Sequence, residues 1–244
     1  EQVNGALRPA AMTFLRVGAA IALVPGFGEQ SIPARIRLAL ALAFTVLIAP
    51  VVADHHAGGP VILPALAEVL AGLLCGLSLR LLVMALQMAA AIAAQSASLS
   101  QLFASAGAEP QPALGTLMTL AALTLALQAG LHVKLTLFLI LSYDLLPAGE
   151  LPSGAMVAGW ATAEAGRALS LAFSLAAPFV IAALLWNLAL GVINRALPQL
   201  MVSFIGAPML AWGGLVLSAL AVPLILSVWM DAMDTALSTP FRGR

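Results

Sequence analysis

The chain has 244 residues, of which 62% are hydrophobic and 8% charged, with a mean hydropathy of +1.07 and a formal net charge of zero. Soluble domains carry roughly 25% charged residues, so the composition excludes an ordinary soluble domain and predicts a polytopic membrane protein. No run of Lys or Arg is long enough to indicate nucleic acid or an acidic lipid headgroup as the main partner, and the single Cys75 excludes an intramolecular disulfide and a cysteine-based metal site.

The N-terminal part predicts a helical hairpin. Residues 10–24 form an apolar run that ends at Pro25, and Pro33 can open a second helix that runs to about Pro50. The first run carries Arg16 and is followed by equal or longer apolar runs, so we interpret it as a helix of the protein and not as a cleaved signal peptide. Both helices are close to the minimum of about 17 residues that a bilayer crossing needs.

The longest apolar run covers residues 61–105. As one straight helix it would measure about 65 Å, roughly twice the thickness of a bilayer core. Either the helix breaks near Arg80, or it extends beyond the membrane inside a larger assembly. Gly72 and Gly76 form a small-residue face suited to close contact with another helix.

Polar residues gather at the end of this run. Gln87, Ser98, Gln101 and Ser105 fall within about 60° of one another on a helical wheel. The stripe faces either a water-filled conduit or a hydrogen-bonded seam between helices, and the sequence leaves both interpretations open. A loop of small residues with two prolines follows: Ser105, Ala106, Gly107, Ala108, Glu109, Pro110, Gln111 and Pro112.

The second half of the chain continues the apolar pattern. Residues 114–146 form a run interrupted at 128–134, and the loop at 147–159 carries no cation. A helix is predicted from about residue 161, and it passes through Pro178. The last helix is predicted at 201–237, with Asp231 and Asp234 near its end at the aqueous boundary.

Six helical passes follow from this count. The positive-inside rule then places the Arg35/Arg37 loop and the Arg195 loop in the cytoplasm, with the loops at 54–60 and 147–159 outside.

A second polar stripe lies on the helix after Pro178. Asn187, Gly191, Asn194 and Pro198 follow one another at i, i+4, i+7 and i+11, which places them on one face. An unpaired amide costs on the order of several kcal/mol in hydrocarbon, so this face must meet another helix, another subunit or water. We expect Arg195 to fix the bend between the last two helices, by donating to carbonyls freed around Pro198 or to a partner's carboxylate.

Catalysis is disfavoured by the motifs. His55, His56 and His132 could be combined with Asp54, Asp144 or Glu68 as metal ligands or a catalytic base. The sequence contains no His-Glu-x-x-His, no Gly-x-Ser-x-Gly and no Gly-rich phosphate loop. A small-solute secondary transporter predicts two similar halves with paired broken helices, and no convincing internal repeat is found. We therefore expect neither a catalytic residue, a metal nor a cofactor.

Two blocks of residues carry a resemblance to a known family. The C-terminal block reads Asn187-Leu188-Ala189-Leu190-Gly191, Asn194-Arg195, Pro198-Gln199 and Ile205-Gly206 with Pro208. The N-terminal block reads Leu15-Arg16, Pro25-Gly26-Phe27-Gly28 and Ser31-Ile32-Pro33 with Arg35-Ile36-Arg37-Leu38. In content and order these blocks resemble the flagellar and type III secretion export-gate subunits, called FliR in flagella and SctT in injectisomes. The resemblance spans nearly the whole chain.

The resemblance implies an all-α polytopic membrane subunit of long broken helices and helical hairpins, built into a larger export-gate assembly. It implies that region 1–151 is similar to the FliP-type subunit and region 152–244 to the FliQ-type subunit. The loop at 105–114 would plug the closed pore, although Glu109-Pro110 stands where the family usually has Asp-Pro. Assembly or structural roles are implied for Arg16, Pro25, Pro33, Arg35, Arg37, Asn187, Gly191, Asn194, Arg195, Pro198, Gln199, Gly206 and Pro208.

The implied function is that of a channel-forming subunit that passes unfolded flagellar proteins across the bacterial inner membrane, within the flagellar basal body. Its implied partners are FliP-like and FliQ-like subunits, FlhB-like and FlhA-like components, export substrates and membrane lipid, and not nucleic acid. The residues from Pro25 to Arg35 favour the flagellar branch; an injectisome subunit and, more remotely, a small-solute transporter are the alternatives. The subunit is expected to be unstable without partners, because lipid cannot satisfy both polar stripes.

Overall fold

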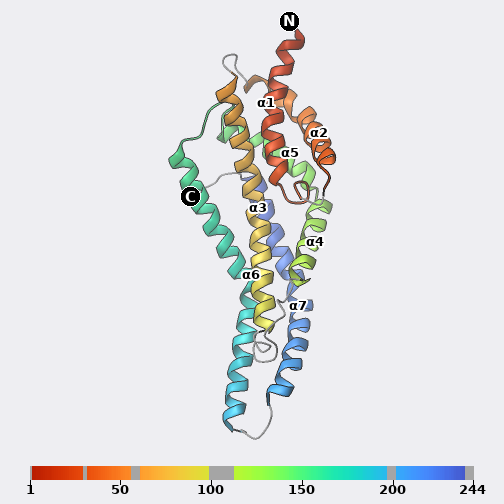
Figure 1. The fold of residues 1–244 in the computed structure, drawn as a ribbon, viewed down its shortest axis with the longest axis vertical. Helices are drawn as coiled ribbons and strands as arrows, with labels where there is room; N and C mark the ends of the chain where they lie inside the picture. The colour runs from red at the N-terminus through yellow and green to blue at the C-terminus, as the bar shows by residue number, and fades with distance from the viewer. Residues whose placement is uncertain (1, 30–31, 56–60, 99–112, 197–201, 240–244) are drawn as a thin grey trace. The chain divides into compact units, whose positions relative to one another are not determined.

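The computed structural model describes residues 2–29, 32–55, 61–98, 113–196 and 202–239, and the regular elements there are all helical (Figure 1). The expectation of an all-α protein is therefore confirmed. The elements are α1 (Gln2–Leu23), α2 (Ala34–Val52), the short 3-10 helix η1 (Ala53–His55), α3 (Ile62–Ser98), α4 (Ala113–Gln128), α5 (Leu131–Leu145), α6 (Gly154–Ala196) and α7 (Val202–Ser238).

The contacts divide the chain into two compact units. Unit 1 comprises Glu1–Val83, Leu123–Arg167 and Asp231–Arg244, and unit 2 comprises Met84–Ala122 and Ala168–Met230. Four helices, α3, α4, α6 and α7, each contribute residues to both units. The predicted kinship of regions 1–151 and 152–244 with two different gate subunits is a separate matter and stays a prediction.

The predicted N-terminal hairpin is confirmed, and α1 and α2 pack against each other (Figure 1). The chain turns at Gly26, whose φ of 78° lies in the left-handed region that favours glycine. Pro33 caps α2, as expected. The predicted end at about Pro50 agrees to within two residues with the end of α2 at Val52. A proline this close to the end of a helix removes one hydrogen bond and leaves only one further turn to disturb.

Helix α3 is continuous through Arg80, so the predicted alternative of a break there was wrong. Its 37 residues correspond to about 55 Å, longer than a bilayer core of about 30 Å. The predicted close contact at the glycines is confirmed. A methyl group on Gly72 would collide with the Arg16 carbonyl of α1, and one on Gly76 would lie 2.6 Å from the Ala20 carbonyl oxygen.

The interruption predicted at 128–134 is a bend of 77° between α4 and α5. Gly130 makes the bend with a φ of 81°. Helix α6 begins at Gly154, earlier than the predicted start near residue 161. Ser153 caps it, because its hydroxyl accepts a hydrogen bond from the Met156 N–H at 3.3 Å and its carbonyl accepts one from Val157 at 3.0 Å.

Among the described residues, four helices are long and apolar enough to cross a membrane, and the bent α4–α5 pair would make a fifth. The four are α2 with its 3-10 extension, α3, α6 and α7. This is fewer than the six passes counted from the sequence, because α1 does not meet the same test. The chain is a multi-pass membrane protein, and its orientation stays a prediction.

Candidate functional site

A buried ion pair connects α1 to α3 in unit 1. The side chains of Arg16 and Glu68 are 1% and 0% exposed. The guanidinium donates two hydrogen bonds to the carboxylate. Nε lies 2.7 Å from Oε2 of Glu68, and one terminal nitrogen lies 3.2 Å from Oε1. A two-donor contact fixes the relative orientation of the two side chains, and hence of the two helices, more tightly than a single contact would.

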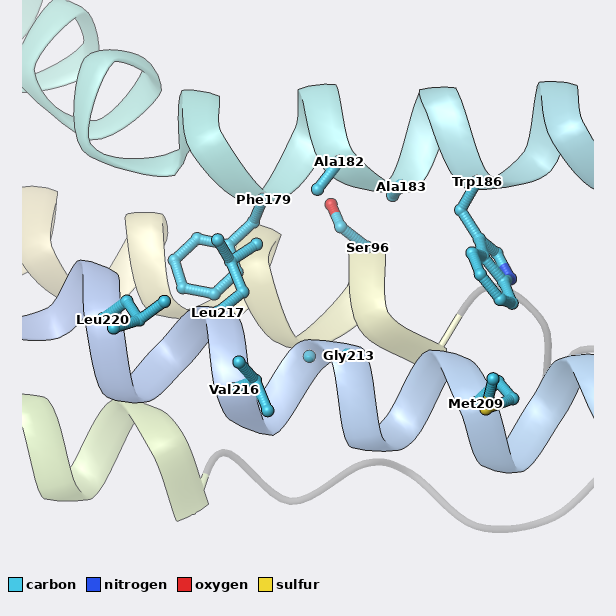
Figure 2. Close-up of a pocket in the computed structure, with 11 residues that line it drawn as sticks. Ser96, Phe179, Ala182, Ala183, Trp186, Met209, Gly213, Val216, Leu217 and Leu220 are labelled. Carbon is cyan, nitrogen blue, oxygen red and sulfur yellow. The ribbon is translucent and has the colours of Figure 1, made fainter.

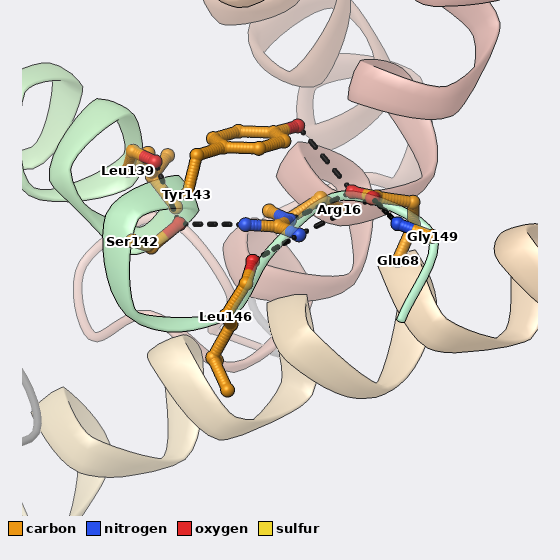
Figure 3. A network of polar contacts seen from close by, with 7 residues as sticks. All are labelled: Arg16, Glu68, Leu139, Ser142, Tyr143, Leu146 and Gly149. Carbon is orange, nitrogen blue, oxygen red and sulfur yellow. Dashed lines mark hydrogen bonds and ion pairs between the residues drawn. The ribbon is translucent and has the colours of Figure 1, made fainter. Parts of the chain in front are cut away.

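The remaining donors and acceptors of this pair find partners on α5 and the segment after it (Figure 3). Arg16 donates to the Ser142 hydroxyl at 3.2 Å and to the Leu146 carbonyl at 2.9 Å, and its guanidinium carbon lies 3.6 Å from the centroid of the Tyr143 ring. The Gly149 N–H donates to Glu68 at 3.0 Å, and the Tyr143 hydroxyl donates to it at 3.4 Å. We call these residues the Arg16 network.

The geometry of the Arg16 network suits a structural role, that of holding several helices together. Buried charges are tolerated when they are paired and hydrogen-bonded, and here one guanidinium joins α1, α3, α5 and the segment that follows α5. The Arg16 and Glu68 side chains are fully buried, so neither charge is accessible to a substrate. The Gly72 contact lies on the same helix pair, one turn along α3 from Glu68, and it allows α1 to come close enough for the ion pair to form.

The sequence contained a signal for this pair that motif reasoning missed. Arg16 is the one charged residue in the apolar run 10–24, and Glu68 is the one acid in the run 61–105. A charge in an apolar helix needs a partner, and the opposite signs of Arg16 and Glu68 make each a candidate partner for the other. Glu68 was instead considered as a member of a hypothetical metal or catalytic set.

That hypothetical set does not come together in the part of the chain that the structure describes. No group of His, Cys, Asp and Glu residues there could hold a metal ion. His132 and Asp144 are both exposed, and Glu68 is committed to Arg16. His56 lies outside the described residues.

Unit 2 contains an apolar cleft between α6 and α7, of about 450 Å³. Figure 2 shows Phe179 and Trp186 projecting from α6 toward α7, while Ser96 of α3 stands near Ala182. Gly213 and Gly214 leave room on the α7 side. The cleft continues into exposed apolar surface, because Leu184 and Leu188 on α6 and Trp212 and Leu220 on α7 are all more than half exposed.

The described residues of the C-terminal block lie on α6 and α7. The Asn187 amide donates to the Ala183 carbonyl of its own helix at 2.9 Å, and Gly191 faces open space, with nothing within 4 Å of an added methyl group. Arg195 is exposed in the last turn of α6. Asn194 belongs to α6, and Gly206 and Pro208 belong to α7. Pro198 and Gln199 lie outside the described residues, so the role predicted for Arg195 at this bend stays a prediction.

The polar stripe, the plug loop and the N-terminal block also include residues inside and outside the described part of the chain. Gln87 is exposed on α3, and Ser98 is its last residue. Gln101 and the predicted plug loop, Ser105 to Pro112, lie outside the described residues. In the N-terminal block Pro25 is buried, Pro33 and Arg35 are exposed, and Arg37 is half-buried. Only Arg16 of that block belongs to the Arg16 network.

The long apolar helices and the buried Arg16–Glu68 ion pair define a multi-pass membrane protein. The family described as bacterial export proteins, family 1, matches residues 8–236. The chain therefore belongs to that family.

Two relatives carry the same name. The flagellar biosynthetic protein FliR of Caulobacter vibrioides is 34% identical over 229 residues, which cover 91% of this chain and 91% of the relative. The flagellar biosynthetic protein FliR of Escherichia coli is 33% identical over 219 residues, which cover 86% of this chain and 83% of the relative. The resemblance inferred from the two sequence blocks is thereby confirmed.

Proposed function

We propose that the chain is a channel-forming subunit of the flagellar type III protein export gate in the bacterial inner membrane. It would pass unfolded flagellar proteins as part of a complex with FliP-like and FliQ-like subunits, next to FlhB-like and FlhA-like components of the basal body. The observation that carries this proposal is the match to two flagellar biosynthetic proteins over most of both chains. The same match favours the flagellar branch over an injectisome.

Surface chemistry supports an assembled state. The α6–α7 cleft and the exposed apolar side chains around it have no covering element among the described residues of unit 2. Lipid can solvate such a surface, but a helix longer than a bilayer core, such as α3, also needs protein around the part that extends beyond it. Partner helices packed on these faces would supply that cover.

The first experiment compares expression of the chain alone with co-expression of FliP-like and FliQ-like subunits from one organism. We expect a stable complex of defined mass only with both partners, measured by affinity purification and size-exclusion chromatography with light scattering. A long-lived, monodisperse single subunit that ignores both partners would contradict the proposal.

The second experiment tests the gate itself. Deleting residues 106–111 from the predicted plug loop should leave the co-purified complex intact while raising solute permeability of cells that carry it with both partners. The control is the unchanged chain expressed at the same level with the same partners. An assembled complex that stays as tight as the control would show that the loop is a connector, without contradicting membership in the complex.

A further inference from the structure

A second cavity, in unit 1, combines an apolar groove with one cation. The groove has a volume of about 360 Å³ and is lined by residues of α1 and α2, together with Val69 of α3. Phe14, Leu15 and Leu38 provide its larger apolar walls. Arg37 is its one charged lining residue. The volume lies within the range of roughly 300–1,000 Å³ that is typical of small-molecule sites.

Arg37 has no acceptor in the described part of the chain. Its Nε is covered by protein and makes no hydrogen bond, and none of the ion pairs there involves its guanidinium. A buried donor without an acceptor is unfavourable, and more so when it belongs to a charged group. Arg16, on the same helix hairpin, shows the contrast, because each of its nitrogens has a partner.

The position of Arg37 indicates where its missing acceptor comes from. It lies in the first turn of α2, a helix apolar enough to cross a membrane, whose exposed side chains include Leu38, Leu42 and Val46. A cation in the first turn of a spanning helix lies at the level of the lipid headgroups. The apolar groove beside it then points along the acyl-chain region.

We propose that this groove binds one anionic phospholipid, whose phosphate accepts hydrogen bonds from the Arg37 guanidinium while an acyl chain lies against Phe14, Leu15 and Leu38. In this arrangement the positive charge of Arg37 meets the negative phosphate, and the apolar groove meets the acyl chain. The site needs no run of basic residues, so it is compatible with the neutral net charge of the chain. It does not depend on the export role.

Two neighbouring residues separate headgroup from tail. Arg35 is exposed, does not line the groove and lies about 200° around the helix from Arg37, so Arg35→Gln is the matched control for Arg37→Gln. Gly18 lines the groove with space for a side chain, since a methyl group there would have its nearest neighbour at 3.9 Å. Gly18→Leu therefore fills the tail groove and leaves the cation in place.

The experiment is native mass spectrometry of the purified chain, alone or in complex, titrated with phosphatidylglycerol, phosphatidylcholine or inorganic phosphate. We expect one bound phosphatidylglycerol, weaker binding of phosphatidylcholine, and affinity for phosphatidylglycerol that falls about tenfold in Arg37→Gln and less than twofold in Arg35→Gln. Gly18→Leu should also lose phosphatidylglycerol. The melting temperature in neutral detergent should be the same for both arginine variants, because neither side chain has an ion-pair partner to lose among the described residues.

Three results would overturn the proposal. If phosphatidylcholine bound as tightly as phosphatidylglycerol, the site would not distinguish lipids by their charge. Unchanged binding in Arg37→Gln would remove the cation from the site. Competition by inorganic phosphate that survives in Gly18→Leu would show that Arg37 binds a free anion and that the groove holds no tail.

Discussion

Units 1 and 2 differ in how their polar side chains are used. Both consist of apolar helices with few charges. In unit 1 the side chains of Arg16 and Glu68 reach across three helices and fix their register. In unit 2 the polar side chains of Ser96, Asn187 and Ser218 each donate to a carbonyl four residues back in their own helix. Those bonds satisfy the polar atoms but tie no helix to another.

The difference has a physical meaning for assembly. A bidentate buried ion pair has one geometry, so unit 1 is specified within the chain itself. Packing of α6 and α7 leaves a cleft of about 450 Å³ and broad exposed apolar faces, so unit 2 depends on what covers it. On the proposed function, unit 1 is the preformed part and unit 2 is the part completed by partner subunits.

Breaking the ion pair should give the largest effect. Glu68→Leu leaves the Arg16 charge buried without its carboxylate, which costs about 3–5 kcal/mol and should lower the melting temperature in detergent far more than the loss of an exposed charge. The double variant Arg16→Met with Glu68→Leu removes both charges and should recover part of the loss. Recovery stays partial, because the Leu146 carbonyl and the Gly149 N–H lose their partners.

The control for this prediction is Arg80→Leu, on the same helix as Glu68. Arg80 is half-buried and belongs to none of the ion pairs in the described residues, so its loss should change stability by no more than about 0.5 kcal/mol. If Arg80→Leu were as damaging as Glu68→Leu, loss of any charge from α3 would explain the result, and the ion pair would have no special role.

The second prediction concerns the close approach that the ion pair needs. Gly72→Ala places a methyl group against the Arg16 carbonyl, so α1 must move away from α3 at a cost of about 1–3 kcal/mol. Gly166→Ala is the matched control, because nothing lies within 4 Å of the added methyl group and alanine favours the helix by about 0.5–1 kcal/mol. Thermal unfolding in the same detergent should therefore move in opposite directions. Equal shifts in melting temperature for the two variants would mean that α1 and α3 are not in close contact at Gly72.

How far the sequence predicts this molecule depends on the range of the interaction involved. Local signals worked, because the turn at Gly26 and the bend at Gly130 follow from backbone preferences of single residues. One element end was missed: the small residues that follow Ser153 indicated a loop, although that serine caps a helix that begins at Gly154. The partner of Arg16 lies 52 residues away. The opposite signs of the two charges suggest the pair, but only the three-dimensional packing shows that the two side chains meet.

The third prediction concerns the α6–α7 cleft of unit 2. Gly213 opens into the α6–α7 cleft, with nothing within 4 Å of an added methyl group, so Gly213→Phe should fill the cleft with little effect on the chain alone. On the proposed function it should reduce recovery of the complex with FliP-like and FliQ-like subunits, because overpacking an interface costs about 1–3 kcal/mol. Gly166→Phe provides the same substitution at an open glycine of unit 1. Normal complex yield from Gly213→Phe would remove the cleft from the interface.

The smallest effect is expected where unit 1 has a second ion pair without burial. Lys134 on α5 and Asp234 on α7 lie 2.7 Å apart, but their side chains are 35% and 49% exposed. Solvent screens such a pair, and exposed pairs typically contribute about 0.2–1 kcal/mol, so Asp234→Asn should lower the melting temperature only slightly. Asp231→Asn is the control, since Asp231 lies one helical turn earlier on α7 and belongs to none of the ion pairs in the described residues. The two variants should differ measurably at low salt and converge in high salt, because screening removes what the exposed pair contributes. A large, salt-independent loss in Asp234→Asn would instead mean that this pair is shielded from water in the membrane, and that burial alone does not separate it from the Arg16 network.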